Sequence, residues 1–149
     1  MKIRLLKKED IKAAAKTICQ NYSKKYEARA VLELKEMFGR SPIKPIFFVA
    51  EDEGVIVGFA GFIQSWMDYN IYQIPWVSVT PARQGQGIGK QLVARVISEI
   101  KKKSGARLIL LTADKSKRLP EYYRKYFKFK VLQSFNEKRE YVMVRSLEK

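Results

Sequence analysis

One stretch of the sequence joins a strand, a glycine-rich loop, a long helix and a second strand, and it restricts the fold more than any other feature. Residues 71–79 (IYQIPWVSV) have the pattern of a strand, and the loop TPARQGQGIG follows them. A helix is predicted over about 87–103, with an apolar stripe of Ile88, Leu92, Val93, Val96, Ile97 and Ile100. The run RLILLT comes next, and its continuous apolar character predicts a strand covered on both faces. Such a crossover is right-handed, so we expect its two strands to be parallel.

The remaining segments predict a sheet of mostly antiparallel strands. Residues 1–6 indicate a strand, and two helices follow, the first with apolar residues at positions 11, 15, 18 and 22 and the second over about 26–38. Segments 46–51 and 55–66 flank the turn EDEG and predict a hairpin, in which Gly58 and Gly61 favour a bulge or a close backbone approach. Pro75 cannot donate a ladder hydrogen bond, so the strand that contains it should be interrupted near its middle.

A short helix over 120–127 and two strands around the turn NEKR complete the chain. We therefore expect a single α/β domain over residues 1–149, with a mixed, mostly antiparallel twisted sheet, a splayed central strand pair and flanking helices.

The composition excludes several kinds of site. The chain has no histidine, which excludes a Ser-His-Asp triad, a Cys-His pair and a histidine-ligated metal. Cys19 is the one cysteine, so an internal disulfide and a cysteine-rich zinc site are excluded, and we expect no metal. Cys19 has apolar neighbours in the first helix, and we expect its side chain to be buried. The sequence has no apolar run of transmembrane length and no secretory signal, which favours a cytoplasmic protein without a membrane partner.

The strongly basic charge balance favours anionic partners. There are 30 lysine and arginine residues against 15 aspartate and glutamate residues, giving a formal net charge of +15. The positive residues are scattered over the chain rather than gathered in a low-complexity arm. We therefore expect a solvated basic surface and no nucleic-acid partner; the alternative, a nucleic-acid-binding module, predicts binding that depends steeply on salt.

The glycine-rich loop is suited to a phosphate or diphosphate. Gly85, Gly87 and Gly89 expose backbone N–H groups where the chain enters the helix, and the helix dipole adds positive potential there. Gln84 and Gln91 stand where a Walker A motif requires glycine and serine or threonine. The spacing Gly-x-Gly-x-Gly also departs from the dinucleotide fingerprint. The loop matches instead the pattern Gln/Arg-x-x-Gly-x-Gly/Ala after a strand that ends in Val-x-Val-x-Pro, here residues 77–81.

With this motif and this order of elements, the sequence resembles the GCN5-related N-acetyltransferase (GNAT) superfamily over nearly its whole length. The resemblance implies a GNAT fold and the transfer of an acetyl group from acetyl-CoA to a primary amine by direct attack, without a covalent enzyme intermediate. It implies that the pantetheine arm of coenzyme A lies along the splayed strand at Val77, Ser78 and Val79. The diphosphate would be bound, mainly through backbone N–H groups, by the loop residues Gln84, Gly85, Gln86, Gly87, Ile88, Gly89 and Lys90.

The resemblance also implies a general acid on the short aromatic helix. Family members often carry the pattern Phe-Tyr-x-Lys-x-Gly-Phe there, and residues 122–125 (YYRK) match its first half, which makes Tyr123 the candidate catalytic residue. Residues 127–129 (FKF) replace the final Gly-Phe, so Tyr122 and Tyr126 remain alternatives. A phenol has a pKa of about 10, so it is protonated at neutral pH and can donate to a departing thiolate. Ser116 replaces the asparagine often found upstream.

No general base is identified by the resemblance. Some family members carry a glutamate at the position of Gln73, and an amide cannot accept a proton at neutral pH. Glu51 and Asp68 are the nearest acidic candidates by topology, and a water chain is the third.

The acceptor is expected to be an amine on a small molecule or a protein. Aromatic and apolar residues of the first two helices and the later hairpins are candidates to line its pocket: Tyr22, Tyr26, Phe38, Trp66, Met67, Tyr69, Tyr72 and Trp76. The basic surface argues against a polycationic acceptor, and a homodimer is compatible with the sequence. The alternative function is a non-catalytic module that binds coenzyme A as a sensor or interaction partner, which Gln73 and the incomplete tyrosine motif favour.

Overall fold

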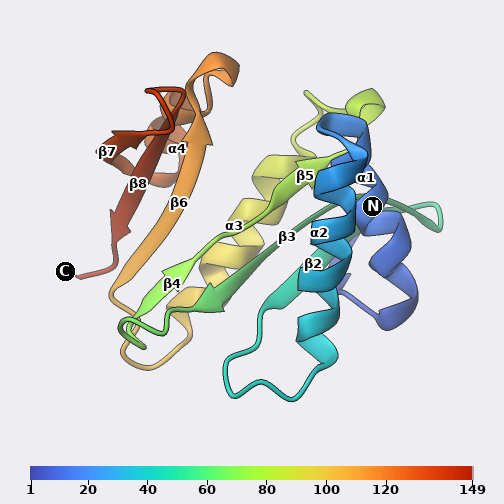
Figure 1. The fold of residues 1–149 in the computed structure, drawn as a ribbon, viewed down its shortest axis with the longest axis horizontal. Coiled ribbons are helices and arrows are strands. Elements are labelled where there is room, and N and C mark those ends of the chain that lie inside the picture. Colours follow the sequence, from blue (N-terminus) through green and yellow to red (C-terminus); the bar gives the residue numbers. More distant parts are fainter. Residues whose placement is uncertain (149) are drawn as a thin grey trace.

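An eight-stranded mixed sheet organises the protein, whose computed structural model describes residues 1–148 (Figure 1). The strands are β1 (Lys2–Leu5), β2 (Ile46–Asp52), β3 (Val55–Gln64), β4 (Ile71–Gln73), β5 (Val77–Val79), β6 (Leu108–Asp114), β7 (Lys130–Phe135) and β8 (Glu140–Ser146). They lie in the order β1-β2-β3-β4-β6-β8-β7, with β5 paired to β3 off this path. Every pairing is antiparallel except that of β4 with β6. The expected single α/β domain with a mostly antiparallel sheet is confirmed.

Four α-helices cover the two faces of this sheet, and short 3₁₀ turns add to them. The helices are α1 (Ile11–Asn21), α2 (Lys24–Lys35), α3 (Ile88–Lys101) and α4 (Leu119–Phe127). Because side chains alternate along a strand, β2 contributes to two separate cores. Phe47 and Val49 pack with α1 and α2, whereas Phe48 and Ala50 pack with α3. In Figure 1, α1 and α2 lie in front of β2 and β3, and α3 lies behind them.

The predicted crossover and its interrupted strand are both present. Strand β4, helix α3 and strand β6 form the unit, and β4 and β6 are parallel, with Gln73 opposite Leu110. Pro75 separates β4 from β5. The ladder to β6 ends at Ile74, whose N–H donates to the Leu110 carbonyl at 2.9 Å, and β5 pairs with β3 instead. Strands β5 and β6 therefore part beyond Pro75, as Figure 1 shows.

Strand β3 has a bulge in its pairing with β2 and lies unusually close to β5 at Gly58. The register shifts by one residue between Ala50 and Glu51, which is a bulge, as expected beside Gly58. A Cβ atom on Gly58 would lie 2.8 Å from the Ser78 carbonyl oxygen of β5. A glycine at this position therefore allows β5 to pair closely with β3.

Two details of the sequence-based prediction are wrong. Strand β6 is buried on one face only: Ile109, Leu111 and Ala113 are buried, whereas Thr112 is exposed. The reason is that α1 and α2 pack on β2 and β3, and they leave this part of β6 open. Cys19 is half-buried rather than buried.

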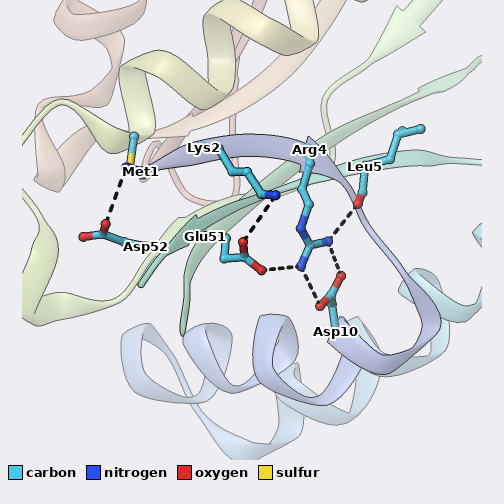
Figure 2. A network of polar contacts seen from close by, with 7 residues as sticks. All are labelled: Met1, Lys2, Arg4, Leu5, Asp10, Glu51 and Asp52. Atoms are coloured by element: carbon cyan, nitrogen blue, oxygen red, sulfur yellow. Dashed lines mark hydrogen bonds and ion pairs between the residues drawn. The ribbon is translucent and has the colours of Figure 1, made fainter. Parts of the chain in front are cut away.

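A cluster of charged residues ties the first strand to β2 and to the start of α1 (Figure 2). The guanidinium group of Arg4 donates to Asp10 at 2.7 and 3.1 Å and to Glu51 at 2.9 Å. Asp10 also accepts from the Lys7 backbone N–H at 2.8 Å, just before α1 begins. The hydrogen bonds from Arg4 lower the pKa of Asp10 below its usual value, although burial opposes the shift.

Among residues 1–148, no helix is long and apolar enough to cross a lipid bilayer.

Candidate active site

The glycine-rich loop presents a row of unused backbone donors at the start of α3. Gly85 and Gly87 have φ angles of +79° and +83°, in the left-handed region that favours glycine. None of the N–H groups from Gly85 to Lys90 donates to a backbone or side-chain acceptor within residues 1–148; the first one engaged is that of Gln91, at 3.1 Å from the Gly87 carbonyl. Free N–H groups at the positive end of a helix dipole bind anions. The local geometry therefore fits a phosphate or diphosphate group.

A cavity of about 440 Å³ opens directly above this loop, and we call it the loop cavity. Its walls are Val79, residues 83–85 and 87–90 of the loop, and two tyrosines of α4, Tyr122 and Tyr126; Gln86 does not line it. The Lys90 ammonium group lies 3.9 Å from the centre of the Tyr126 ring. This contact fixes a positive charge at the cavity wall, where it adds to the potential of the helix terminus.

Arg83 braces the loop rather than standing free beside it. Its Nη2 donates to Asp52 at the end of β2 at 2.8 Å, and its Nε donates to the Gln86 side chain at 2.9 Å. The same aspartate lies 3.5 Å from the amino group of Met1, as Figure 2 shows. The charge of Arg83 is thus largely used in holding the loop.

A polar cluster, which we call the Asn21 clamp, joins the end of α1 to β5 and the loop. The Asn21 amide donates to Ser78 Oγ at 3.1 Å and to the Val79 carbonyl at 2.8 Å. The Gln84 amide donates to Asn21 Oδ1 at 2.8 Å and to the same carbonyl at 3.0 Å. Ser78 Oγ also accepts from Thr17 at 2.9 Å. The side chains of Ser78 and Gln84 are therefore engaged with the end of α1 and with β5, and the Ser78 backbone pairs with β3.

One edge of β5 carries backbone groups that point into the gap between the parted strands. The Thr80 N–H donates to the Val57 carbonyl of β3 at 2.8 Å. In an antiparallel ladder such groups alternate, so the N–H groups of Val77 and Val79 point away from β3. These two donors are suited to bind an extended amide-containing chain.

A second and larger cavity of about 660 Å³ lies at the other side of this gap, and we call it the acceptor cavity. It is bounded by the α1–α2 connection, the segment from Ile74 to Val77, β6, α4 and the β7–β8 turn. Of the aromatic residues that the sequence offered for a pocket, Tyr22, Tyr26 and Trp76 line it. Trp66, Met67 and Tyr69 are instead exposed in the β3–β4 connection, Phe38 lies outside both cavities, and Tyr72 is buried in the core.

The structure separates the three tyrosines of α4. Tyr123 lines the acceptor cavity, whereas Tyr122 and Tyr126 line the loop cavity. The Tyr123 side chain is only 5% exposed. Burial raises the pKa of Tyr123 well above the ordinary tyrosine value, and the nearby hydroxyls of Tyr122 and Tyr22 add to this shift. Burial, with a contribution from Tyr126, raises the pKa of Tyr122 to about 12. Both phenols are therefore protonated at neutral pH.

The acidic residues proposed as bases are engaged elsewhere. Glu51 accepts from Arg4 in the cluster of Figure 2, and this hydrogen bond lowers the pKa of its carboxyl group. Asp68 accepts from the Asn70 backbone N–H at 2.8 Å in the β3–β4 connection. Neither residue lines either cavity, and Gln73 is exposed outside both. Ser116 is held by Asp114 at the end of β6.

Sequence reasoning missed Glu33 of α2, whose carboxylate lines the acceptor cavity. Glu33 Oε2 accepts a hydrogen bond from the indole nitrogen of Trp76. No local signal distinguishes this glutamate from the other charged residues of α2, because its role depends on a strand more than forty residues later in the chain.

Comparison with known proteins identifies the family. The sequence profile of the family described as "Acetyltransferase (GNAT) domain" matches residues 44–126, more than half of the chain. A GNAT-family structure from Desulfovibrio desulfuricans superposes with a TM-score of 0.81 at 16% identity, covering 99% of both chains. An aminoglycoside 6'-N-acetyltransferase solved with coenzyme A gives a TM-score of 0.80 at 17% identity, covering 100% of this chain and 98% of that one.

YncA of Salmonella typhimurium, solved with acetyl-CoA, gives a TM-score of 0.75 at 20% identity, covering 100% of this chain and 95% of that one. At such identities the structures establish the fold alone, and among curated proteins no sequence matches. The fold and the profile match together show that the chain belongs to the GNAT acetyltransferase superfamily.

Proposed function

We propose that this protein is an acetyl-CoA-dependent N-acetyltransferase that transfers an acetyl group to a primary amine. One observation carries the proposal: the free N–H groups of the loop and the open edge of β5 lie on one path, which leads to a buried phenol facing a second cavity. A diphosphate, an amide-containing arm and a reacting end could be bound along such a path in that order. The family match supports the same reading.

The binding residues follow from this path. The backbone from Gln84 to Lys90 would hold the diphosphate, with the Lys90 ammonium group beside it. The N–H groups of Val77 and Val79 would hold the pantetheine arm, while Ser78 holds the strand against α1. Preorganised N–H groups on this strand can also stabilise negative charge that develops on a carbonyl oxygen.

Tyr123 is the proposed general acid. When bound, acetyl-CoA supplies the acetyl group as a thioester, whose C–S bond breaks as the new C–N bond forms. The Tyr123 hydroxyl keeps its proton throughout the neutral range, because burial raises its pKa. It can therefore deliver a proton to a departing thiolate. The place of Tyr122 and Tyr126 in the other cavity favours Tyr123 over both.

Release of thiol from acetyl-CoA over a broad panel of amines tests the proposal. We expect turnover with the wild type, and a kcat lower by about 100-fold in Tyr123→Phe, the range of a lost general acid. Tyr69→Phe removes an equivalent hydroxyl from an exposed tyrosine and should leave kcat unchanged. Acetyl-CoA binding without turnover on any amine would instead favour the non-catalytic sensor. The absence of Glu51 and Asp68 from both cavities is compatible with that alternative.

A further inference from the structure

The size of the acceptor cavity fits a small molecule. Its volume of about 660 Å³ lies within the range of small-molecule sites. Its two rims also touch each other: Lys117, in the turn after β6, places its ammonium group 4.5 Å from the centre of the Tyr22 ring at the end of α1. This contact joins the end of α1 to the turn after β6 beside the cavity. A cavity of this size can hold a free small molecule.

The charge of this cavity differs from that of the whole protein. Three carboxylates, of Glu33, Asp114 and Glu140, line it together with the guanidinium groups of Arg29 and Arg139. The chain as a whole carries +15. The acceptor cavity is therefore a region of mixed and locally acidic character, and the basic surface gives no guide to what binds inside it.

Glu33 is the carboxylate of the three that lies beside β5, and both of its oxygens have partners, Oε2 in Trp76 and Oε1 in Arg29. Asp114 accepts on Oδ1 from the N–H and hydroxyl of Ser116 at 2.8 and 2.7 Å, and Glu140 accepts on Oε2 from Asn136 at 2.9 Å. The ion pair of Glu33 is weak by comparison: Arg29 Nε lies 3.4 Å away on a side chain that is 71% exposed.

The position of Glu33 is fixed by the strand that would hold the cofactor. The Trp76 indole donates to Glu33 Oε2, and Trp76 immediately precedes Val77 of β5. A cation that displaces the exposed Arg29 side chain from Oε1 of this carboxylate would thus lie beside the open strand edge. Charge-assisted hydrogen bonds of this kind are stronger than those between neutral groups.

The aromatic walls around Glu33 suit the same ligand. Tyr22 and Tyr26 pack edge to face, with ring centres 6.1 Å apart, and Trp76 lies on the opposite strand. Aromatic faces attract ammonium groups, and the Lys117 contact shows that the Tyr22 face does so in this molecule.

We propose that the acceptor is a small amine that binds as an organic cation, with its ammonium group on Glu33 and its carbon skeleton against Tyr22, Tyr26 and Trp76. The ammonium group gives one proton to the Glu33 carboxylate before the neutral nitrogen attacks the thioester. The inference rests on the proposed function, because it concerns the acceptor of that reaction. The proposal predicts that the ammonium group of a compound increases its affinity for the cavity. A carboxylate on the carbon next to the ammonium group should decrease that affinity.

Matched pairs of compounds test this prediction. The probes are 2-phenylethylamine and 1,5-diaminopentane, each compared with its carboxylated counterpart, phenylalanine or lysine. We expect at least one amine of the two pairs to exceed its counterpart in kcat/KM by roughly tenfold or more, as discrimination by one buried charge allows. Equal or better use of both amino acids would overturn the proposal, because the guanidinium groups would then select a carboxylate.

Variants of Glu33 locate the effect. In Glu33→Gln we expect KM for the preferred amine to rise roughly 30-fold, the loss of one charge-assisted hydrogen bond, with KM for acetyl-CoA unchanged. Glu36→Gln makes the same charge change one turn further on, outside both cavities, and should change neither constant. Trp76→Phe keeps the charge and removes the indole donor, so an intermediate rise is expected even where Glu33→Gln folds poorly. An unchanged amine KM in both variants would overturn the proposal.

Calorimetric titration of the amines in the presence of coenzyme A separates this inference from the proposed function. Binding that is lost in Glu33→Gln, without turnover in the wild type, would support the cation site and refute the acetyltransferase. Turnover that does not depend on Glu33 would do the reverse. No binding of either amine and no turnover with either would count against both.

Discussion

The loop cavity and the acceptor cavity are built in different ways. The loop cavity is made mostly by consecutive backbone groups, since the N–H groups from Gly85 to Lys90 are its main donors and the Lys90 ammonium group adds to them. The acceptor cavity is made by side chains from five separate parts of the chain. A site made by local backbone geometry can be found in a sequence and tolerates few substitutions. A site made by distant side chains is harder to find and easier to alter.

The first way to test this difference is to change the backbone of the loop. Gly87 has a φ of +83°, which a β-branched residue rarely adopts. We expect Gly87→Val to weaken acetyl-CoA binding by about 100-fold or more, since the row of N–H groups would lose its direction. Gly54→Val is the matched control, because Gly54 has a φ of +78° in the β2–β3 turn and also has no atoms near its missing Cβ. If both variants retain full affinity by calorimetry, the loop does not bind the cofactor through its backbone.

The second test asks whether the two cavities are independent. Asn21→Ala removes the hydrogen bonds to Ser78 and Val79 and leaves Gln84 without one of its acceptors. We expect KM to rise roughly tenfold for acetyl-CoA and also for the amine, because three hydrogen bonds, two of them part-buried, are lost at the joint between the cavities. Steady-state kinetics measure both constants, with Lys16→Ala, an exposed change on α1, as the control. An effect on one substrate alone would show that the cavities are separable at this residue.

A third test uses pH to examine Tyr123. Its pKa is raised by burial, so the phenol is protonated below pH 10 and cannot lose its proton there. We expect kcat to decrease by less than about twofold between pH 8 and 10. The profile of Tyr123→Phe should have the same shape at a lower level. A falling limb with a midpoint below pH 10 that disappears in Tyr123→Phe would show an acid with an ordinary or lowered pKa.

The smallest catalytic effect is expected at Asp10, because the Arg4, Asp10 and Glu51 part of the cluster in Figure 2 lines neither cavity. Asp10→Asn should leave both KM values unchanged and lower the free energy of unfolding by about 2 kcal/mol at neutral pH, the range of a hydrogen bond to a charged group. The pKa of Asp10 is lowered in the folded state, so its contribution is complete above the unfolded value of 3.8 and is lost as the pH falls below it. Urea unfolding at pH 7 and pH 3 should therefore show a smaller difference between wild type and variant at pH 3. A change in acetyl-CoA affinity would contradict the separation of this cluster from the site.

Much of the fold could be predicted because its signals are local. The interruption at Pro75, the close approach at Gly58 and the hairpin around Gly54 depend on residues whose backbone preferences are strong by themselves. The burial of β6 could not be predicted, because an apolar run shows what can be covered and not which helices lie over it. Thr112 is exposed for this reason, although its strand is otherwise apolar.

The same limit applies to the candidate site. The glycines of the loop indicate a phosphate site because their spacing in the sequence shows where backbone N–H groups are exposed at the start of the helix. Glu33 and Asp52 carry no such signal: the first depends on Trp76 and the second on Arg83, and each pair is distant in sequence. Glu51 and Asp68 are reasonable candidates for a base by topology. In the structure, however, Glu51 forms an ion pair with Arg4, and Asp68 accepts a hydrogen bond from the Asn70 N–H in a turn.

The Asn21 clamp has a consequence for protein engineering. It anchors the end of α1 at one residue, and the very next residue, Tyr22, already lines the acceptor cavity. The hydrogen bonds of the clamp do not involve the segment that follows, residues 22–26. If the proposed function holds, libraries that randomise residues 22–26 and keep Asn21 should therefore change the choice of amine at little cost to acetyl-CoA binding.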